Sequence, residues 1–211
     1  FYYFIKTYFF SFNFNKYTSS IKQNSYRLLR LANNLIDTSR IESDYISANL
    51  KVKNIVEIIE NIIATLVDYA HNNNVDLIFD TNEEEFITRC DPSMIERVLL
   101  NLLSNAIKFT PENKNIYVNI CVNDDFAEID IKDEGIGIAK NDRAAIFERF
   151  VQADKSLTRE NEGSGIGLSI VKSIIDLHGG YISVESEVNE GSTFKIILPH
   201  RYDNNINYKI Y

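Results

Sequence analysis

With 211 residues, 45% of them hydrophobic and 25% charged, the chain is long enough to bury a sizeable core, which favours one main domain with a short appendage. The formal net charge of −8 argues against a nucleic-acid-binding surface, because such surfaces need clustered Lys and Arg side chains. Cys90 and Cys121 lie far apart without a CxxC spacing, so we expect buried free thiols rather than a disulfide or a metal site.

The chain begins with an aromatic-rich segment, residues 1–16, for which the pattern predicts no structure. Residues 17–47 contain neither Pro nor Gly and repeat apolar residues at a three-to-four spacing, which predicts a long amphipathic helix. Such a helix cannot bury its apolar stripe alone, so it has to pack on another helix of the chain, on a segment outside this sequence or on a second copy. We expect a boundary near Ala48, so that this helical unit covers residues 17–48.

The main domain is expected over residues 49–200, followed by a tail over 201–211. It opens with a short strand over 49–53 and a helix from 55 to about 70, whose apolar side chains recur at helical spacing. Strands over 75–80 and 86–90 flank an acidic turn, and a helix then starts at Pro92 with Asp91 as its N-cap.

Two strands with alternating polarity follow over 115–122 and 126–133, joined by a turn at 123–125. After a short helix and a long polar loop, a helix over 168–177 is ended by Gly179 and Gly180. The last strands cover 181–186 and 192–199. Because helices interleave with antiparallel strand pairs, the sequence predicts an α+β fold built as a two-layer α/β sandwich.

Three polar residues share one face of the predicted helix over 92–109, since Asn101, Asn105 and Lys108 follow one another at i, i+4 and i+7. The opposite face is apolar and is expected in the core: Ile95, Val98, Leu102, Ala106 and Phe109. Inside a helix Asn costs roughly half a kcal/mol relative to Ala. A solvated face would explain one asparagine, but two of them with a lysine favour a ligand-binding face.

Two glycine clusters follow. In the first, Asp133 ends a strand just before Gly135 and Gly137, so that a carboxylate can accept a hydrogen bond from an exocyclic amine while the glycines admit a flat ring. This signal is weak alone and is no dinucleotide-binding fingerprint, because a third glycine and a parallel sheet are not indicated.

The second cluster, Gly163, Gly165 and Gly167, opens directly into a helix, whose free N–H groups attract an anion. It is no Walker A loop, and a plain tight turn is the alternative. The polar loop before it carries Lys155 and Arg159, which could reach phosphates if the loop closed over a ligand or could be surface charges.

Taken in order, these motifs resemble those of the nucleotide-binding domain of bacterial sensor histidine kinases, in the wider family shared with gyrase, Hsp90 and MutL. NLLSNAIKFT resembles the N box, DEGIGI the first glycine box, FERF the F box, GSGIGLSIVK the second glycine box and EGSTFKIILP the terminal strand motif. The resemblance covers about residues 49–199 and implies the fold of that family. Residues 17–47 are similar to the second helix of the kinases' dimerisation hairpin.

The resemblance implies ATP and Mg²⁺ as cofactors. Asn105 would bind the metal, Asn101 and Lys108 would contact phosphate oxygens directly or through water, and Asp133 would accept the adenine amine, with Thr193 supporting Asp133 or a nearby water. Lys155 and Arg159 join Asn101 and Lys108 as expected catalytic residues. The full expected cofactor-binding set is Asn101, Asn105, Lys108, Asp133, Gly135, Gly137, Ile138, Phe150, Gly163, Ser164, Gly165, Ile166, Gly167, Leu168 and Thr193.

Asn101 separates two classes of enzyme within this resemblance. The hydrolytic relatives carry a glutamate there to activate water, and an amide cannot accept that proton. A positioned base is worth about 10²- to 10⁴-fold, so ATP hydrolysis of the gyrase and Hsp90 type is disfavoured. Transfer of the γ-phosphoryl group to a histidine needs less help, because a neutral imidazole is already a nucleophile. The sequence therefore favours a histidine kinase of a two-component system.

The acceptor histidine is not where the resemblance expects it, in a helix preceding residues 17–47. None of His71, His178 and His200 is followed by the acceptor pattern, so the chain resembles a kinase without its own acceptor, through truncation or degeneration. Some kinase branches also carry an arginine near Gln152, whose role would pass to Lys155 or Arg159 or be lost. A non-catalytic nucleotide-binding or dimerisation module is therefore the alternative.

The resemblance also implies partners and a location. The expected partners are ATP, a histidine-bearing hairpin of the same or a partner kinase chain, and a response regulator receiver domain. A homodimer is expected if the hairpin is complete, and no nucleic-acid partner is. No stretch reaches the roughly eighteen apolar residues of a membrane helix, and no signal-peptide pattern opens the chain. We therefore expect a cytoplasmic domain, with any membrane anchor in a parent kinase.

Overall fold

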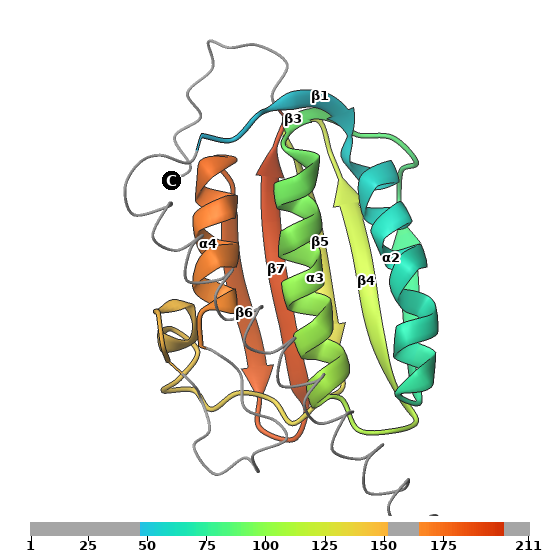
Figure 1. Ribbon diagram of the computed structural model, residues 1–211, viewed down its shortest axis with the longest axis vertical. Helices are drawn as coiled ribbons and strands as arrows, with labels where there is room; N and C mark the ends of the chain where they lie inside the picture. Colours follow the sequence, from blue (N-terminus) through green and yellow to red (C-terminus); the bar gives the residue numbers. More distant parts are fainter. Residues whose placement is uncertain (1–46, 152–164, 201–211) are drawn as a thin grey trace, which may run out of the picture.

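Three helices cover one face of a five-stranded sheet in the computed structural model, which describes residues 47–151 and 165–200 (Figure 1). The helices are α2 (Ile55–Asn72), α3 (Pro92–Phe109) and α4 (Gly167–Leu177). The sheet consists of β2 (Val75–Thr81), β4 (Lys114–Val122), β5 (Phe126–Asp133), β6 (Tyr181–Glu187) and β7 (Gly191–Pro199). A short 3₁₀-helix, η1 (Ala145–Phe147), precedes α4. The predicted two-layer α/β sandwich is confirmed.

The strand order in the sheet is β2-β4-β5-β7-β6. The hairpins β4–β5 and β6–β7 are antiparallel, as the sequence predicted, whereas β2 pairs with β4 in parallel. The strands expected on either side of the acidic turn both form, but they do not pair with each other. Instead β3 (Ile87–Cys90) pairs with β1 (Lys51–Asn54) in a separate two-stranded sheet, which leads into α3 above the main sheet.

The core fills the space between the helices and the inner face of the sheet. On α3 the apolar residues at helical spacing are buried as predicted, including Ile95, Val98, Leu102 and Ala106, whereas Phe109 is only half-buried. The inner positions of β4 and β5, among them Ile120 and Ile129, lie opposite them. Strand residues alternate between the two faces, and only one face carries described helices.

The two cysteines differ in burial, and for Cys121 the alternation of strand faces is the reason. Cys90 is buried, as expected. The expectation that Cys121 is buried is wrong, because its side chain lies on the outer face of β4, which no described helix covers. Among residues 47–151 and 165–200, no helix combines the length and the apolar character that crossing a membrane requires.

The start of α3 is fixed as its sequence predicts. Asp91 is the N-cap, and its Oδ1 accepts hydrogen bonds from the backbone N–H groups of Ser93 and Met94 at 3.1 and 3.3 Å. Pro92 occupies the first helical position, where a backbone N–H is not needed. The helix therefore runs unbroken from Pro92 to Phe109, and its C-terminal end lies at the lower end of the sandwich in Figure 1.

Candidate nucleotide-binding site

The amide-bearing face of α3 meets the first turn of α4. Asn101 is largely buried, with 9% of its surface exposed, and its Nδ2 donates a hydrogen bond to the carbonyl oxygen of Arg97 at 2.9 Å. A Cβ placed on Gly167 would lie 2.8 Å from Asn101 Oδ1, so a side chain there would push the Asn101 amide out of its place. Asn105 and Lys108 are half-buried further along α3. The structure thus brings a helix start and an amide oxygen together.

Asp133 ends β5 as a buried carboxylate with 6% of its surface exposed. Its Oδ1 accepts hydrogen bonds from the backbone N–H of Gly135 at 2.9 Å and of Ser192 at 3.3 Å. Burial raises the pKa of Asp133 above its ordinary value, and the two backbone hydrogen bonds lower it in part. Neither N–H group bonds Oδ2, so the second oxygen can accept a hydrogen bond from a ligand.

The loop after Asp133 is pressed between α3 and the β6–β7 hairpin. A Cβ on Gly135 would lie 2.6 Å from Asp133 Oδ1 and 2.7 Å from the carbonyl oxygen of Phe109. Gly137 has a φ of +69°, and a Cβ there would lie 1.9 Å from the carbonyl oxygen of Glu187. Both glycines are therefore required by space, and they join Asp133 to the end of α3 that carries Lys108.

The second glycine cluster is partly described. Gly165 has a φ of +67°, and its carbonyl oxygen accepts a hydrogen bond from the backbone N–H of Phe150 at 2.9 Å. Phe150 itself is 66% exposed. Ile166 is buried and Leu168 packs against the core, so both anchor the start of α4 rather than face open solvent. The remaining predicted residues of this region lie outside the described residues: Lys155, Arg159, Gly163 and Ser164.

One predicted contact is corrected by the strand register. Asp133 pairs with Ser192 on β7, whereas Thr193 pairs with Lys132 and therefore points to the opposite face of the sheet. Thr193 therefore does not contact the Asp133 carboxylate directly, and the backbone N–H of Ser192 makes that contact; support of a nearby water by Thr193 stays a prediction. Ile138 is placed beside the site by a hydrogen bond from its backbone N–H to Ser186 Oγ at 2.7 Å.

Ser186 and Ser192 are the site residues that the sequence reasoning missed. Both are buried, with 7% of their surface exposed, and both sit on the inner face of their strands. The sequence does contain a sign of this for Ser186, because it shares its strand face with the apolar Ile182 and Val184. A polar side chain on a buried apolar face needs hydrogen-bond partners.

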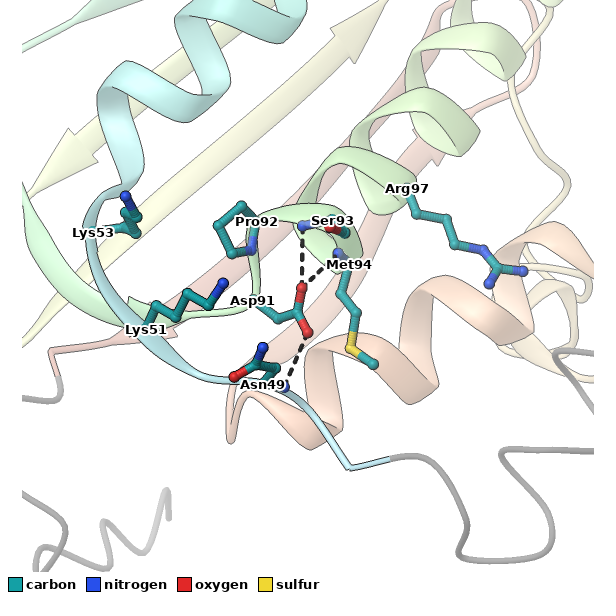
Figure 2. Close-up of a pocket in the computed structure, with 8 residues that line it drawn as sticks. All are labelled: Asn49, Lys51, Lys53, Asp91, Pro92, Ser93, Met94 and Arg97. Atoms are coloured by element: carbon teal, nitrogen blue, oxygen red, sulfur yellow. Dashed lines mark hydrogen bonds between the residues drawn. The ribbon is translucent and has the colours of Figure 1, made fainter.

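A separate groove of about 600 Å³ lies at the N-terminal end of α3 (Figure 2). It is lined by Asn49, Lys51, Lys53, Asp91, Pro92, Ser93, Met94 and Arg97. Its carboxylate already caps the helix and accepts a hydrogen bond from the backbone N–H of Asn49 at 3.0 Å. From Met94 to Lys108 the helix rises by roughly 20 Å. The groove is thus remote from Lys108, whereas Arg97 in its lining lies about one helical turn from Asn101, which donates a hydrogen bond to the Arg97 carbonyl oxygen.

Comparison with known proteins identifies the family. Residues 90–202 match the family described as histidine kinase-, DNA gyrase B- and HSP90-like ATPase. The circadian input-output histidine kinase CikA of Synechococcus elongatus is 32% identical over 88% of this chain, and the chain spans 25% of that protein.

Two solved structures share the fold. Full-length ShkA in complex with AMPPNP superposes with a TM-score of 0.76 at 26% identity, over 88% of this chain and 38% of that one. The catalytic domain of histidine kinase ThkA gives a TM-score of 0.63 at 30% identity, over 72% of this chain and 97% of that one. This chain therefore belongs to the histidine kinase-, DNA gyrase B- and HSP90-like ATPase family, as an ATP-binding catalytic domain of the histidine kinase type.

Proposed function

We propose that this chain binds Mg²⁺-ATP at the lower end of the sandwich and transfers the γ-phosphoryl group to a histidine on a hairpin of a partner chain or of a segment outside this sequence. The proposal rests on one observation: the glycine loop over residues 134–138 contacts both the buried Asp133 carboxylate and the end of α3. Asp133 supplies a buried acceptor on one side of the loop, and the end of the amide-bearing helix contacts its other side. A molecule with an aromatic amine and a polyanion fits both halves.

The residues of α3 suit the phosphate end. Because Asn101 Nδ2 is engaged with the carbonyl of Arg97, its Oδ1 is an acceptor, which suits a metal-bound water better than a phosphate oxygen. Asn105 would hold Mg²⁺ through its own amide oxygen, and Lys108 would contact phosphate oxygens. When bound, the metal neutralises charge on the phosphates during transfer.

Asn101 also favours transfer over hydrolysis. Its amide, held by Arg97, cannot accept a proton from water, so no general base stands at this position. Lys155 and Arg159 remain proposed contacts of the transferred phosphoryl group. In this proposal Asn101 and Lys108 orient ATP and supply no general base. The histidine of the partner hairpin is the nucleophile that attacks the γ-phosphorus.

The partners follow from the same proposal. A histidine-bearing hairpin is the phosphoryl acceptor, and a homodimer forms if the parent chain carries the complete hairpin. The structure of ThkA with the response regulator TrrA supports a receiver domain as the next acceptor. The expected location is the cytoplasm. The chain spans only part of its curated relatives, so these assignments concern a parent kinase as much as this domain.

The test combines binding with transfer. Calorimetry with Mg²⁺-ATP should show binding by the wild-type chain, and γ-labelled ATP should give an acid-labile label on a separately supplied histidine hairpin. Asn105→Ala should abolish the metal dependence of binding, whereas Asn119→Ala, an exposed asparagine on the outer face of β4, should not.

Each other result selects another function. Absence of binding heat would refute the proposal. Binding without label on the hairpin would favour a non-catalytic nucleotide-binding module, and rapid multiple-turnover phosphate release would favour a hydrolase of the gyrase and Hsp90 type.

A further inference from the structure

We propose that Ser186 is a positioning residue of the base-binding half of the site, and that its hydroxyl sets the loop over residues 134–138 against the β6–β7 hairpin. This inference rests on the proposed ATP site above. It concerns a side chain that lies on β6, outside every glycine motif and outside the amide-bearing helix.

The Ser186 hydroxyl is fully used. Its Oγ donates a hydrogen bond to the carbonyl oxygen of Gly191 at 2.7 Å and accepts one from the backbone N–H of Ile138 at 2.7 Å. Ser192 Oγ lies 3.0 Å away. A hydroxyl has one proton and two lone pairs. Because the proton of Ser186 goes to Gly191, Ser192 is the donor in the third bond. Ser186 thus joins β6 to two other segments, the start of β7 and the loop that ends at Ile138.

These bonds continue a row that crosses the sheet. Ser186 on β6 pairs with Ser192 on β7, and Ser192 pairs with Asp133 on β5. The backbone N–H of Ser192 reaches Asp133 Oδ1, and the hydroxyl of Ser192 reaches Ser186. The carboxylate that would accept the base and the serine that holds the loop are therefore positioned by the same residue of β7.

Hydrogen bonds hold the loop over residues 134–138 at its start, in its middle and at its end. At its start, the backbone N–H of Gly135 bonds Asp133 Oδ1. In its middle, the carbonyl oxygen of Ile136 accepts a hydrogen bond from the backbone N–H of Asn189 at 2.8 Å. At its end, Ile138 bonds Ser186. Removal of the Ser186 hydroxyl frees the end of the loop next to Ile138, while Asp133 keeps both of its backbone donors.

The Ser186 hydroxyl makes no contact with the described residues of the phosphate half of the site, although the middle of the loop meets the end of α3, where the backbone N–H of Ile136 donates to the carbonyl oxygen of Phe109 at 3.3 Å. Asn101, Asn105 and Lys108 lie on α3, whereas Ser186 bonds Ile138, Gly191 and Ser192, which lie outside that helix. Loss of the hydroxyl should therefore weaken binding of the base and leave the orientation of the phosphates unchanged. In kinetic terms, KM for ATP rises and kcat stays the same.

The experiment compares Ser186→Ala, Ser186→Thr and Ser183→Ala. Ser183 lies on the same strand but on the outer face, so it controls for a serine-to-alanine change in β6. For Ser186→Ala we expect ATP affinity to fall about tenfold, because the amide of Ile138 and the carbonyl of Gly191 each lose a partner. The affinity for Mg²⁺ with inorganic triphosphate should be unchanged, and amide hydrogen exchange at Ile138 should become faster. Ser186→Thr, which keeps a hydroxyl, should restore both readouts.

The outcomes are separable. Unchanged ATP affinity in Ser186→Ala, or equal losses for ATP and inorganic triphosphate, overturns the inference while the ATP site stands. If wild type binds no ATP, the proposed function fails and takes the inference with it. If Ser186→Ala does not fold, Ser186→Cys, which keeps the size and a weak donor, must show an affinity between those of wild type and a chain without ATP binding; wild-type affinity there overturns the inference.

Discussion

Asp133→Asn is the substitution that most directly tests how the site selects its base. Asn has nearly the same shape, and its Oδ1 can accept the backbone N–H groups of Gly135 and Ser192 as the carboxylate does. The amide NH₂ then stands where Oδ2 was. A donor thus replaces the acceptor, and the 6-amino group of adenine, itself a donor, faces another donor.

The magnitude follows from the bond that is lost. A hydrogen bond to a charged group contributes about 1.5–3 kcal/mol, which corresponds to about a 10- to 150-fold loss of ATP affinity. Inosine triphosphate carries a 6-oxo acceptor, so its affinity should rise relative to ATP. Calorimetry of both nucleotides with wild type, Asp133→Asn and the exposed control Asp76→Asn measures this. Equal ATP affinity in wild type and Asp133→Asn would refute the reasoning.

The same variant makes a prediction about stability and pH. Burial raises the pKa of Asp133 in the folded state above its ordinary value of 3.8, so on acidification the folded protein takes up the proton first. The ionised carboxylate therefore lowers stability at neutral pH, and Asp133→Asn should unfold at a higher denaturant concentration there. This advantage should shrink as the pH falls through the raised pKa and vanish below the unfolded value. A constant difference across that window would contradict the assignment.

Three further changes test the packing around the site. Gly137→Ala should lower the free energy of unfolding by at least about 2 kcal/mol in chemical denaturation, because φ is +69° and the new Cβ meets the carbonyl of Glu187; wild-type stability would show that the loop can shift. His178→Leu should lower the free energy of unfolding by about 2 kcal/mol, because the backbone N–H of Asp91 loses its acceptor, His178 Nε2, at 3.0 Å. Thermal unfolding measures this, and a melting temperature equal to that of wild type would contradict it. Cys121 should react with a thiol reagent in the native protein, whereas Cys90 should react only after unfolding, because burial and then Asp91 raise its pKa to about 11; rapid modification of Cys90 in the native state would contradict its burial.

The elements whose signals are local could be predicted from the sequence. Helix α3 was predictable because its N-cap, its first-turn proline and its apolar spacing agree, and the amide-bearing face followed from the same periodicity. Asp133 and its two glycines were predictable because they sit together in one motif, and the structure shows both glycines against backbone or carboxylate oxygens. In such places a short stretch of chain determines its own conformation.

Pairings between distant segments were not predictable in the same way. The sequence around Asp80 and Ile87 indicates two strands but not that their partners are β4 and β1, since pairing depends on contacts formed far along the chain. The choice between Ser192 and Thr193 depends on strand parity, and an error of one residue moves a side chain to the other face of the sheet.

His178 shows a similar limit. A histidine at the C-terminal end of a helix, as here, is usually favoured in its positively charged form by the helix dipole. In the structure Nδ1 lies 2.7 Å from the carbonyl oxygen of Ile174, and Nε2 accepts the backbone N–H of Asp91. Those two bonds require a neutral imidazole with its proton on Nδ1. The partner that decides this lies 87 positions away in sequence and was not visible in the local pattern.

The two sides of α3 differ, because the proposed ligand residues lie on one side and core residues lie on the other. A nucleotide bound to the proposed residues would therefore stabilise a helix whose other side packs into the hydrophobic core. By mass action, nucleotide at a hundredfold excess over its dissociation constant adds about 2.7 kcal/mol to the folded state. The domain should accordingly resist proteases longer in nucleotide-replete medium than in depleted medium, so that its lifetime becomes a readout of the energy supply.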